Sequence, residues 1–330
     1  MSSDQIFVPP LDQEELDAGW ETLRMPNLGR LDQAEQRRIR AVSQEVADLV
    51  EPWLTAVSDQ YRGLSWTIAV TLAAITPELP PAALVPVVKF SCWTLVFDDA
   101  FDNHHLSIAE HHGRMRHFLE FVEGDEPATT DPVLLALGDC LDELRESPLF
   151  AELEPQWRSA LRETMRAMLV ECEWRHAYQA DQRTLPSFED YLAVAVEAID
   201  SRPVTWAALA VIGDRSILEE MDFLRGISVT LARCIRLSND LRTHAKEALE
   251  GTVNSVLIRT AGEPVDQERL DAALHGITVD VDQHLRELEW HAEHFRTRTG
   301  RAEKWIADCA DFVFEFYSRH EYRTLFDAES

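Results

Sequence analysis

Two motifs in this sequence hold the side chains best suited to chemistry, and both are rows of oxygen ligands. The first is the DDxxD stretch from Asp98 to Asp102, whose two end carboxylates share one face of a helix. The second is NDLRTHAKE, in which Asn239, Thr243 and Glu247 recur every four residues along one face. Such hard oxygens suit Mg²⁺, which usually takes one or two carboxylates and completes its shell with water and substrate phosphates. The two motifs therefore predict two walls of a magnesium–diphosphate site.

The two motifs differ in how specific they are. A DDxxD stretch arises easily by chance in an aspartate-rich chain, so alone it is weak evidence. The second motif is longer and rarer, and the joint occurrence of both, in this order and on helix-like segments, is the stronger observation. The alternative is that both are solvated acidic faces of ordinary helices. It explains the second motif poorly, because a surface helix has no reason to place Asn, Thr and Glu at this spacing.

The composition limits the partners that this chain can have. Its 330 residues are 45% hydrophobic and 27% charged, which is typical of a globular protein with a sizeable core. The formal net charge of −28 argues against nucleic acid or an anionic membrane as partner, but suits divalent cations. We see no secretory signal, and no apolar run long enough to predict a transmembrane helix. Homodimerisation stays open. Five scattered cysteines without metal-ligand spacing indicate buried thiols and a cytoplasmic protein: Cys92, Cys140, Cys172, Cys234 and Cys309.

The periodicity predicts an all-α fold in one domain covering residues 1–330. Helix-favouring residues dominate, alternating strand patterns are scarce, and proline and glycine fall mostly between periodic segments. No repeat or linker divides the chain. We expect helices at 33–50, 55–75, 81–102, 106–123, 132–145, 149–180, 187–212, 215–247, 251–260, 266–297 and 301–324.

The helices that carry the motifs are expected to be buried. Residues 84–97 are apolar almost all round, and residues 227–237 are largely apolar before the second motif begins. Burying a helix that ends in carboxylates is costly unless cations neutralise them. A metal site at the mouth of a cavity would remove that cost.

Both motifs, in this order and over most of the chain, resemble those of bacterial class I terpene synthases, or terpene cyclases. The resemblance implies an α-helical bundle around a central apolar cavity, three Mg²⁺ ions and the ionisation of an isoprenoid diphosphate. It implies Asp98 as the principal ligand of the first motif, supported by Asp99 and Asp102. It implies Asn239, Thr243 and Glu247 as the metal ligands of the second.

The resemblance also implies which residues bind the diphosphate group. Lys246 matches a basic residue that is frequent in the second motif. Arg319 lies roughly where the family has a C-terminal Arg-Tyr pair, although its neighbour is His320, and Tyr322 follows two residues later. Many relatives carry a diphosphate-sensing arginine at the position of Ala195. Arg202 is the candidate to substitute for it, at a different spacing, and Arg202 or Arg236 is expected to add hydrogen bonds to the diphosphate.

The segment from Tyr191 to Pro203 gives an expectation for the substrate. It looks more like that of kaurene-synthase-like enzymes, which act on bicyclic labdane-type diphosphates, and Pro203 should kink or break its helix. We therefore expect a diterpene synthase that uses geranylgeranyl diphosphate or a bicyclic, copalyl-like diphosphate. The sequence contains no DxDD motif, so we do not expect protonation-initiated cyclisation. A sesquiterpene synthase using farnesyl diphosphate is the alternative, and an isoprenyl diphosphate synthase or a non-enzymatic helical scaffold is weaker.

A dry apolar pocket should hold the reacting hydrocarbon. Aromatic faces there stabilise positive charge by roughly 0.5–2 kcal/mol each. Phe90 and Thr94 have the strongest claim, because they precede Asp98 by about two turns and one turn of helix. Plain core packing is the alternative for every candidate. His104 and His105, beside the first motif, are either solvated loop residues or a nearby proton acceptor. The cavity candidates are Phe90, Thr94, Phe97, Ile199, Trp206, Trp305 and Phe312, with Trp93 on the same helix.

Overall fold

All secondary structure in the described part of the chain is helical, which confirms the predicted all-α fold. The computed structural model describes residues 11–58, 60–101, 106–125, 129–261, 266–322 and 325. The elements are α1 (Gln13–Leu23), α2 (Pro26–Arg30), α3 (Gln33–Val57), α4 (Leu64–Ile75), α5 (Pro81–Phe101), α6 (Ile108–Glu123), α7 (Pro132–Arg145), α8 (Phe150–Ala180), α9 (Phe188–Ala198), α10 (Ser201–Ile212), the 3₁₀ helix η1 (Arg215–Glu219), α11 (Met221–Glu250), α12 (Ser255–Thr260), α13 (Gln267–Glu293) and α14 (Arg301–Tyr317).

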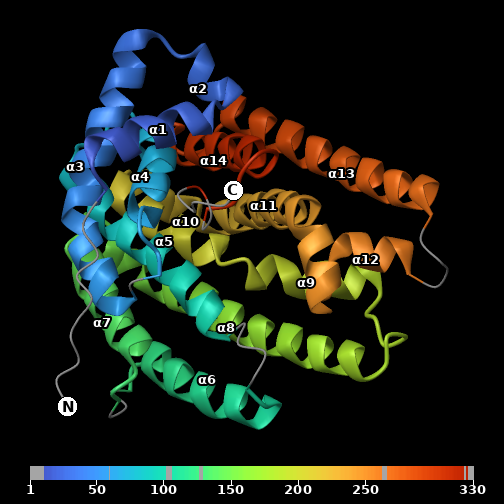
Figure 1. Cartoon of the computed structure of the whole chain (residues 1–330). Helices are drawn as coiled ribbons and strands as arrows, with labels where there is room; N and C mark the ends of the chain where they lie inside the picture. Colours follow the sequence, from blue (N-terminus) through green and yellow to red (C-terminus); the bar gives the residue numbers. More distant parts are fainter. Residues whose placement is uncertain are drawn as a thin grey trace.

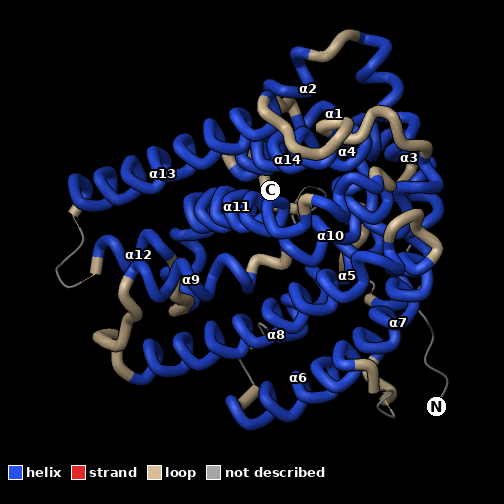
Figure 2. The backbone as a smooth tube through the Cα atoms, turned by 180° about the vertical axis from the view of Figure 1, so that it is seen from behind, coloured by secondary structure: helices blue, strands red, loops and turns tan. Residues whose placement is uncertain are grey.

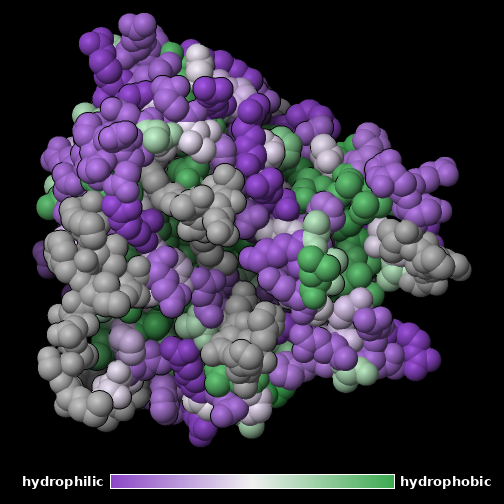
Figure 3. Space-filling model, viewed as in Figure 1, coloured by the Kyte–Doolittle hydropathy of each residue, from purple (hydrophilic) through white to green (hydrophobic). Residues whose placement is uncertain are grey.

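The helices form a bundle in which α11 runs through the middle of the view, with α13 and α14 above it and α8 below (Figure 1). Helix α11 packs against α13, α14, α10 and α9, while α5 packs against α3, α4, α7 and α10. Figure 2 shows the same arrangement from behind. The face drawn in Figure 3 is mostly hydrophilic, as the net charge of −28 leads us to expect. Helices α5 and α11, which carry the two motifs, therefore lie inside the bundle.

Helix α5 is the apolar helix that ends at the first motif. Its side chains are buried on several sides, and the indole nitrogen of Trp93 donates a hydrogen bond to the carbonyl of Val133 at 2.7 Å. By length and composition the helix could cross a membrane, but 56% of that window is buried inside the bundle. The helix is therefore a core element, and it delivers Asp98 at its C-terminal end.

Helix α11 carries the second motif on its C-terminal half. Its first half buries Ile227 and Leu231 in the main core. The helix ends at Glu250, and its C-cap is Gly251, whose φ of 72° lies in the left-handed region that favours glycine. The amide of Gly251 caps the carbonyl of Glu247, so the last ligand position of the motif lies in a closed final turn.

The segment predicted as one helix over 187–212 is two helices. Helix α9 ends at Ala198, and α10 begins at Ser201 after a break at Ile199 and Asp200. Asp200 has a φ of 59°, a left-handed conformation that aspartate tolerates better than most residues. Pro203 then falls in the first turn of α10, where its missing amide donor costs little. The predicted break is present, but it precedes the proline by several residues.

Helices α1 and α2 were not predicted from the sequence. Asp12 caps α1: its carboxylate accepts a hydrogen bond from the amide of Glu15. The carboxylate of Glu15 accepts one from the amide of Asp12, and the two bonds form a capping box. A further difference lies at 55–75, where α3 ends at Val57 and α4 begins only at Leu64. Gly63, with a φ of 81°, caps α4.

Candidate functional site

Two adjoining cavities open between α5, α8, α10 and α11. The outer cavity, of about 190 Å³, has a polar mouth, and the inner one, of about 120 Å³, is mostly apolar. The two cavities adjoin, because seven residues line both: Thr94, Leu95, Ile199, Asp200, Ile235, Tyr317 and Tyr322. The arrangement offers a polar entrance that leads to an apolar interior, which suits a ligand with a charged head and a hydrocarbon tail.

The two motifs meet at the outer cavity. Asp98 reaches it from α5, and Asn239, Thr243 and Glu247 reach it from α11. Within the described ranges, no three His, Cys, Asp or Glu side chains converge as a metal site by themselves. An ion between these walls would therefore need oxygens from water or a ligand, as Mg²⁺ usually does. The donor set, which is carboxylate, amide and hydroxyl oxygen without sulfur, fits that ion.

Glu247 is held in place by Asn254. The amide nitrogen Nδ2 of Asn254 donates to Oε2 of Glu247 at 2.6 Å and to the backbone carbonyl of Asp240 at 3.1 Å. Burial, with the nearby Asp240 carboxylate, raises the pKa of Glu247 to about 7. On the same face, the hydroxyl of Thr243 donates to the carbonyl of Asn239 at 2.9 Å. A carboxylate that burial makes costly to ionise is a good partner for a cation.

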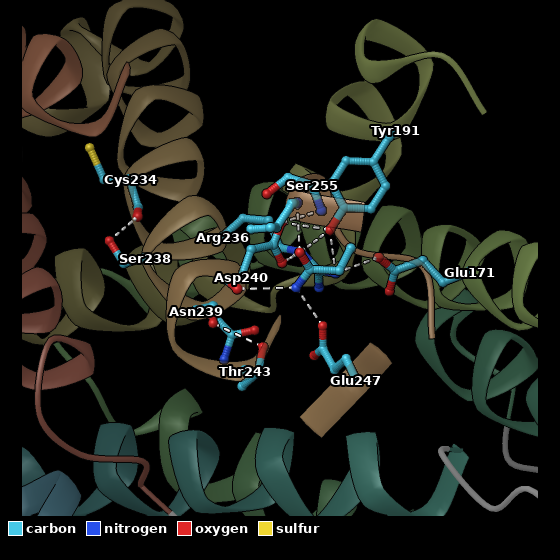
Figure 4. Close-up of polar contacts among 12 residues, drawn as sticks. Glu171, Tyr191, Cys234, Arg236, Ser238, Asn239, Asp240, Thr243, Glu247 and Ser255 are labelled. Carbon is cyan, nitrogen blue, oxygen red and sulfur yellow. Dashed lines mark hydrogen bonds and ion pairs between the residues drawn. The ribbon is translucent and has the colours of Figure 1, made fainter. Parts of the chain in front are cut away.

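Behind the metal face lies a buried polar network, in which Tyr191, Asp240 and Glu171 gather around Arg236 (Figure 4). The hydroxyl of Tyr191 accepts hydrogen bonds from Nε and Nη2 of Arg236, at 2.9 and 2.6 Å, and donates to Oδ2 of Asp240 at 2.8 Å. Arg236 also forms ion pairs with Asp240 at 3.0 Å and with Glu171 at 3.3 Å. Burial opposes the charge of Arg236, but these two carboxylates raise its pKa well above the usual value. Asp240 therefore serves the packing of α11 and not the cavity wall.

In the first motif, too, one carboxylate lines the cavity and its neighbour makes a contact elsewhere. Asp98 lines the cavity, whereas the carboxylate of Asp99 accepts a hydrogen bond from the hydroxyl of Tyr61 at 2.5 Å. Asp99 is not among the lining residues, so the structure gives it a supporting position. Asp102 lies outside the described residues, as do His104 and His105.

The expected diphosphate-binding residues lie in different places. Lys246, Arg236 and Tyr322 line the outer cavity, and the hydroxyl of Tyr322 lies 3.2 Å from that of Thr71. The structure does not bring Arg202 there, because its guanidinium pairs with Glu163 at 3.0 Å and with Glu197. Arg319 is exposed after the end of α14 and lines neither cavity.

Phe90 is a correction to the expected cavity wall. It lies in the core, where it packs against Trp93 and Trp157. Trp157 comes from α8, so packing between helices makes this part of α5 core, and Phe90 lines neither cavity. Ser91 is seven residues before Asp98 and lines the inner cavity instead.

The other expected cavity residues divide in the same manner. Thr94 and Ile199 line both cavities, and Trp305 lines the inner one. Three line neither cavity and are buried in the main core: Phe97, Trp206 and Phe312.

Sequence reasoning missed the contribution of α8. Glu171 and Arg175 line the outer cavity with Met168 and Cys172. One signal in the sequence could have found them: Glu171 and Arg175 are a charged pair four residues apart on a helix that also carries buried apolar residues. Arg175 is only 4% exposed. The spacing alone does not say which cavity such a pair faces.

Comparisons with known proteins agree with this arrangement. Residues 89–269 match the family model described as terpene synthase family 2, C-terminal metal binding. The chloroplast ent-beyerene synthase of Oryza sativa subsp. japonica is 29% identical over 131 residues, which are 38% of this chain and 15% of that enzyme. An ent-isokaur-15-ene synthase of Oryza sativa subsp. indica is 30% identical over 99 residues, 29% of this chain and 11% of that enzyme. The match thus spans only a small part of these curated relatives.

Solved structures share the fold. The linalool/nerolidol synthase of Streptomyces clavuligerus, in complex with 2-fluorogeranyl diphosphate, superimposes with a TM-score of 0.63 at 17% identity. That likeness covers 84% of this chain and 93% of the other. Abietadiene synthase of Abies grandis gives a TM-score of 0.65 at 17% identity, covering 84% of this chain and 38% of that one. At such identities the likeness concerns the α-helical architecture.

Proposed function

The chain belongs to terpene synthase family 2, and we propose that it is a class I terpene synthase that ionises an isoprenoid diphosphate with divalent metal ions. One observation carries this proposal. Asp98 on α5 and the row Asn239, Thr243 and Glu247 on α11 line the same polar cavity, and an apolar cavity adjoins it. A charged diphosphate and its hydrocarbon chain need these two environments side by side.

The residues of the mouth and the interior have separate tasks in this proposal. Bound Mg²⁺, three ions if the family resemblance holds in full, would neutralise the diphosphate leaving group and so favour cleavage of its C–O bond. Lys246 and Arg236 offer charged N–H donors to the diphosphate oxygens. The inner cavity keeps the hydrocarbon away from water, and the rings of Trp305 and Tyr317 give it aromatic walls that favour positive charge. The product would be a terpene and free diphosphate.

For the substrate we propose a diterpene precursor, either geranylgeranyl diphosphate or a bicyclic, copalyl-like diphosphate. The segment from Tyr191 to Pro203 resembles that of kaurene-synthase-like enzymes. The names of the curated relatives, ent-beyerene synthase and ent-isokaur-15-ene synthase, support the same class.

A product assay tests the proposal directly. Purified protein with Mg²⁺ is offered geranyl, farnesyl, geranylgeranyl and ent-copalyl diphosphate separately, and the organic extract is analysed. We expect a product from geranylgeranyl or ent-copalyl diphosphate, none after chelation of the metal, and none from the Asp98→Ala or Asn239→Ala variants. A product from farnesyl diphosphate alone would replace the diterpene assignment. Full turnover in both variants would contradict the metal-site assignment.

A further inference from the structure

Tyr191 belongs to neither motif, yet its hydroxyl joins α9 to the second motif's helix. The side chain is fully buried. The hydroxyl accepts two hydrogen bonds from the guanidinium of Arg236 and donates one to Asp240. A phenol has one proton and two lone pairs, so every bonding position of this hydroxyl is used. Burial also raises the pKa of Tyr191, which keeps the hydroxyl protonated and neutral.

These bonds decide which part of Arg236 is left for a ligand. The Nε and Nη2 nitrogens are engaged by Tyr191, Asp240 and Glu171. Among the described residues, Nη1 of Arg236 donates no hydrogen bond. Because Arg236 lines the outer cavity, Nη1 is the part of the fork that remains for a ligand there. The guanidinium is therefore held along one edge while the other edge stays available.

We propose that Tyr191 is a positioning residue that holds Arg236 ready for the diphosphate group of the substrate, an inference that rests on the proposed function. The neutral hydroxyl occupies one edge of the fork without cancelling its charge. Without that hydroxyl, the fork can turn and pair through two nitrogens with Asp240 or Glu171, and such bidentate pairs are strong. A guanidinium committed to those carboxylates has fewer N–H groups for a diphosphate.

The same contact links the mouth of the cavity to the break between α9 and α10. Tyr191 lies on α9, and this helix leads into Ile199 and Asp200, which line both cavities. Helix α9 also packs directly against α11. Because Tyr191 joins Arg236 to α9, it also fixes the position of the guanidinium relative to Ile199 and Asp200 in the cavity wall.

The test compares Tyr191→Phe with Tyr178→Phe. Tyr178 packs beside Tyr191 in the same small apolar cluster, and no hydrogen bond of its hydroxyl is present among the described residues, so it is the matched control. Binding of inorganic diphosphate in excess Mg²⁺ is measured by titration calorimetry. We expect Tyr191→Phe to weaken binding by roughly ten- to a hundred-fold, the range for losing a hydrogen bond to a charged group, and Tyr178→Phe to bind like the wild type.

A double-mutant cycle separates positioning from general structural damage. On an Arg236→Gln background, Tyr191→Phe should add little, because its effect acts through Arg236. Additive losses, or wild-type affinity in Tyr191→Phe, would overturn the inference. If Tyr191→Phe does not fold, Arg236→Lys decides: an ammonium has no planar fork that the hydroxyl can hold along one edge, so wild-type affinity there would overturn the inference equally. A wild-type protein that binds no diphosphate with Mg²⁺ would contradict the proposed function itself.

Discussion

Asp98 and Asp99 are neighbours in sequence, but their carboxylates serve different parts of the structure. Asp98 lines the outer cavity, whereas Asp99 accepts a hydrogen bond from the hydroxyl of Tyr61, on the loop between α3 and α4, at 2.5 Å. Successive helical residues point about 100° apart, so both cannot face the same ion from one helix. The first motif thus combines a cavity ligand with an anchor for the end of α5.

This division predicts unequal effects of two similar substitutions. Asp98→Asn should lower turnover by at least about a hundred-fold, because it removes a charged oxygen from the proposed metal site. Asp99→Asn and Tyr61→Phe should instead lower the free energy of unfolding by about 1–3 kcal/mol and change turnover by less than about ten-fold. Turnover at saturating Mg²⁺ and denaturant unfolding check both expectations. Equal losses of turnover in Asp98→Asn and Asp99→Asn would show that the two carboxylates share one role.

Asn254→Ala should lower the affinity for Mg²⁺ without replacing any of the proposed metal ligands. The side chain of Asn254 holds Glu247 at 2.6 Å and also caps α12. Loss of such an outer contact typically lowers metal affinity by about 10- to 100-fold. The Mg²⁺ concentration for half-maximal turnover should rise accordingly.

Asp266→Ala is the matched control for Asn254→Ala. Asp266 caps α13 in the same way but is exposed and lies away from the cavity. Both substitutions should cost about 1 kcal/mol of stability through the lost cap. Only Asn254→Ala should change the Mg²⁺ concentration for half-maximal turnover. An unchanged concentration in that variant would show that Asn254 does not support the metal site.

The sequence was sufficient for the elements that depend on local pattern. The apolar periodicity predicted α5 and α11, and the i, i+4, i+8 spacing placed Asn239, Thr243 and Glu247 on the one face that the cavity uses. It could not provide the partner of Arg202, because Glu163 comes from α8 and only tertiary packing brings it near. The location of Phe90 was wrong for the same reason: Trp157, which packs against its ring, also comes from α8.

Stability should depend on pH through His284. Burial and the nearby Arg233 lower the pKa of His284 below its ordinary value of 6.5. The unfolded chain then binds more protons than the folded one just below pH 6.5, so stability rises with pH there and is lost as the pH falls below about 6.5. The melting temperature should drop between pH 7.5 and 5.5 in the wild type, and less in His284→Gln. His275→Gln, an exposed position on the same helix, should behave like the wild type; an equal pH dependence in His284→Gln would refute the assignment.

Product selection should respond to Ile235 and not to Phe90. Ile235 lines both cavities, so Ile235→Val changes the contour that the hydrocarbon meets, at a stability cost of about 0.5–1.5 kcal/mol. Phe90 is fully buried against Trp93 and Trp157 and lines neither cavity, so Phe90→Leu should cost about 1–3 kcal/mol and leave product proportions unchanged. Analysis of the terpene mixture, with unfolding measured alongside, checks both. A changed mixture in Phe90→Leu at a temperature where the variant is fully folded would show that the core behind α5 shapes the cavity as strongly as its wall does.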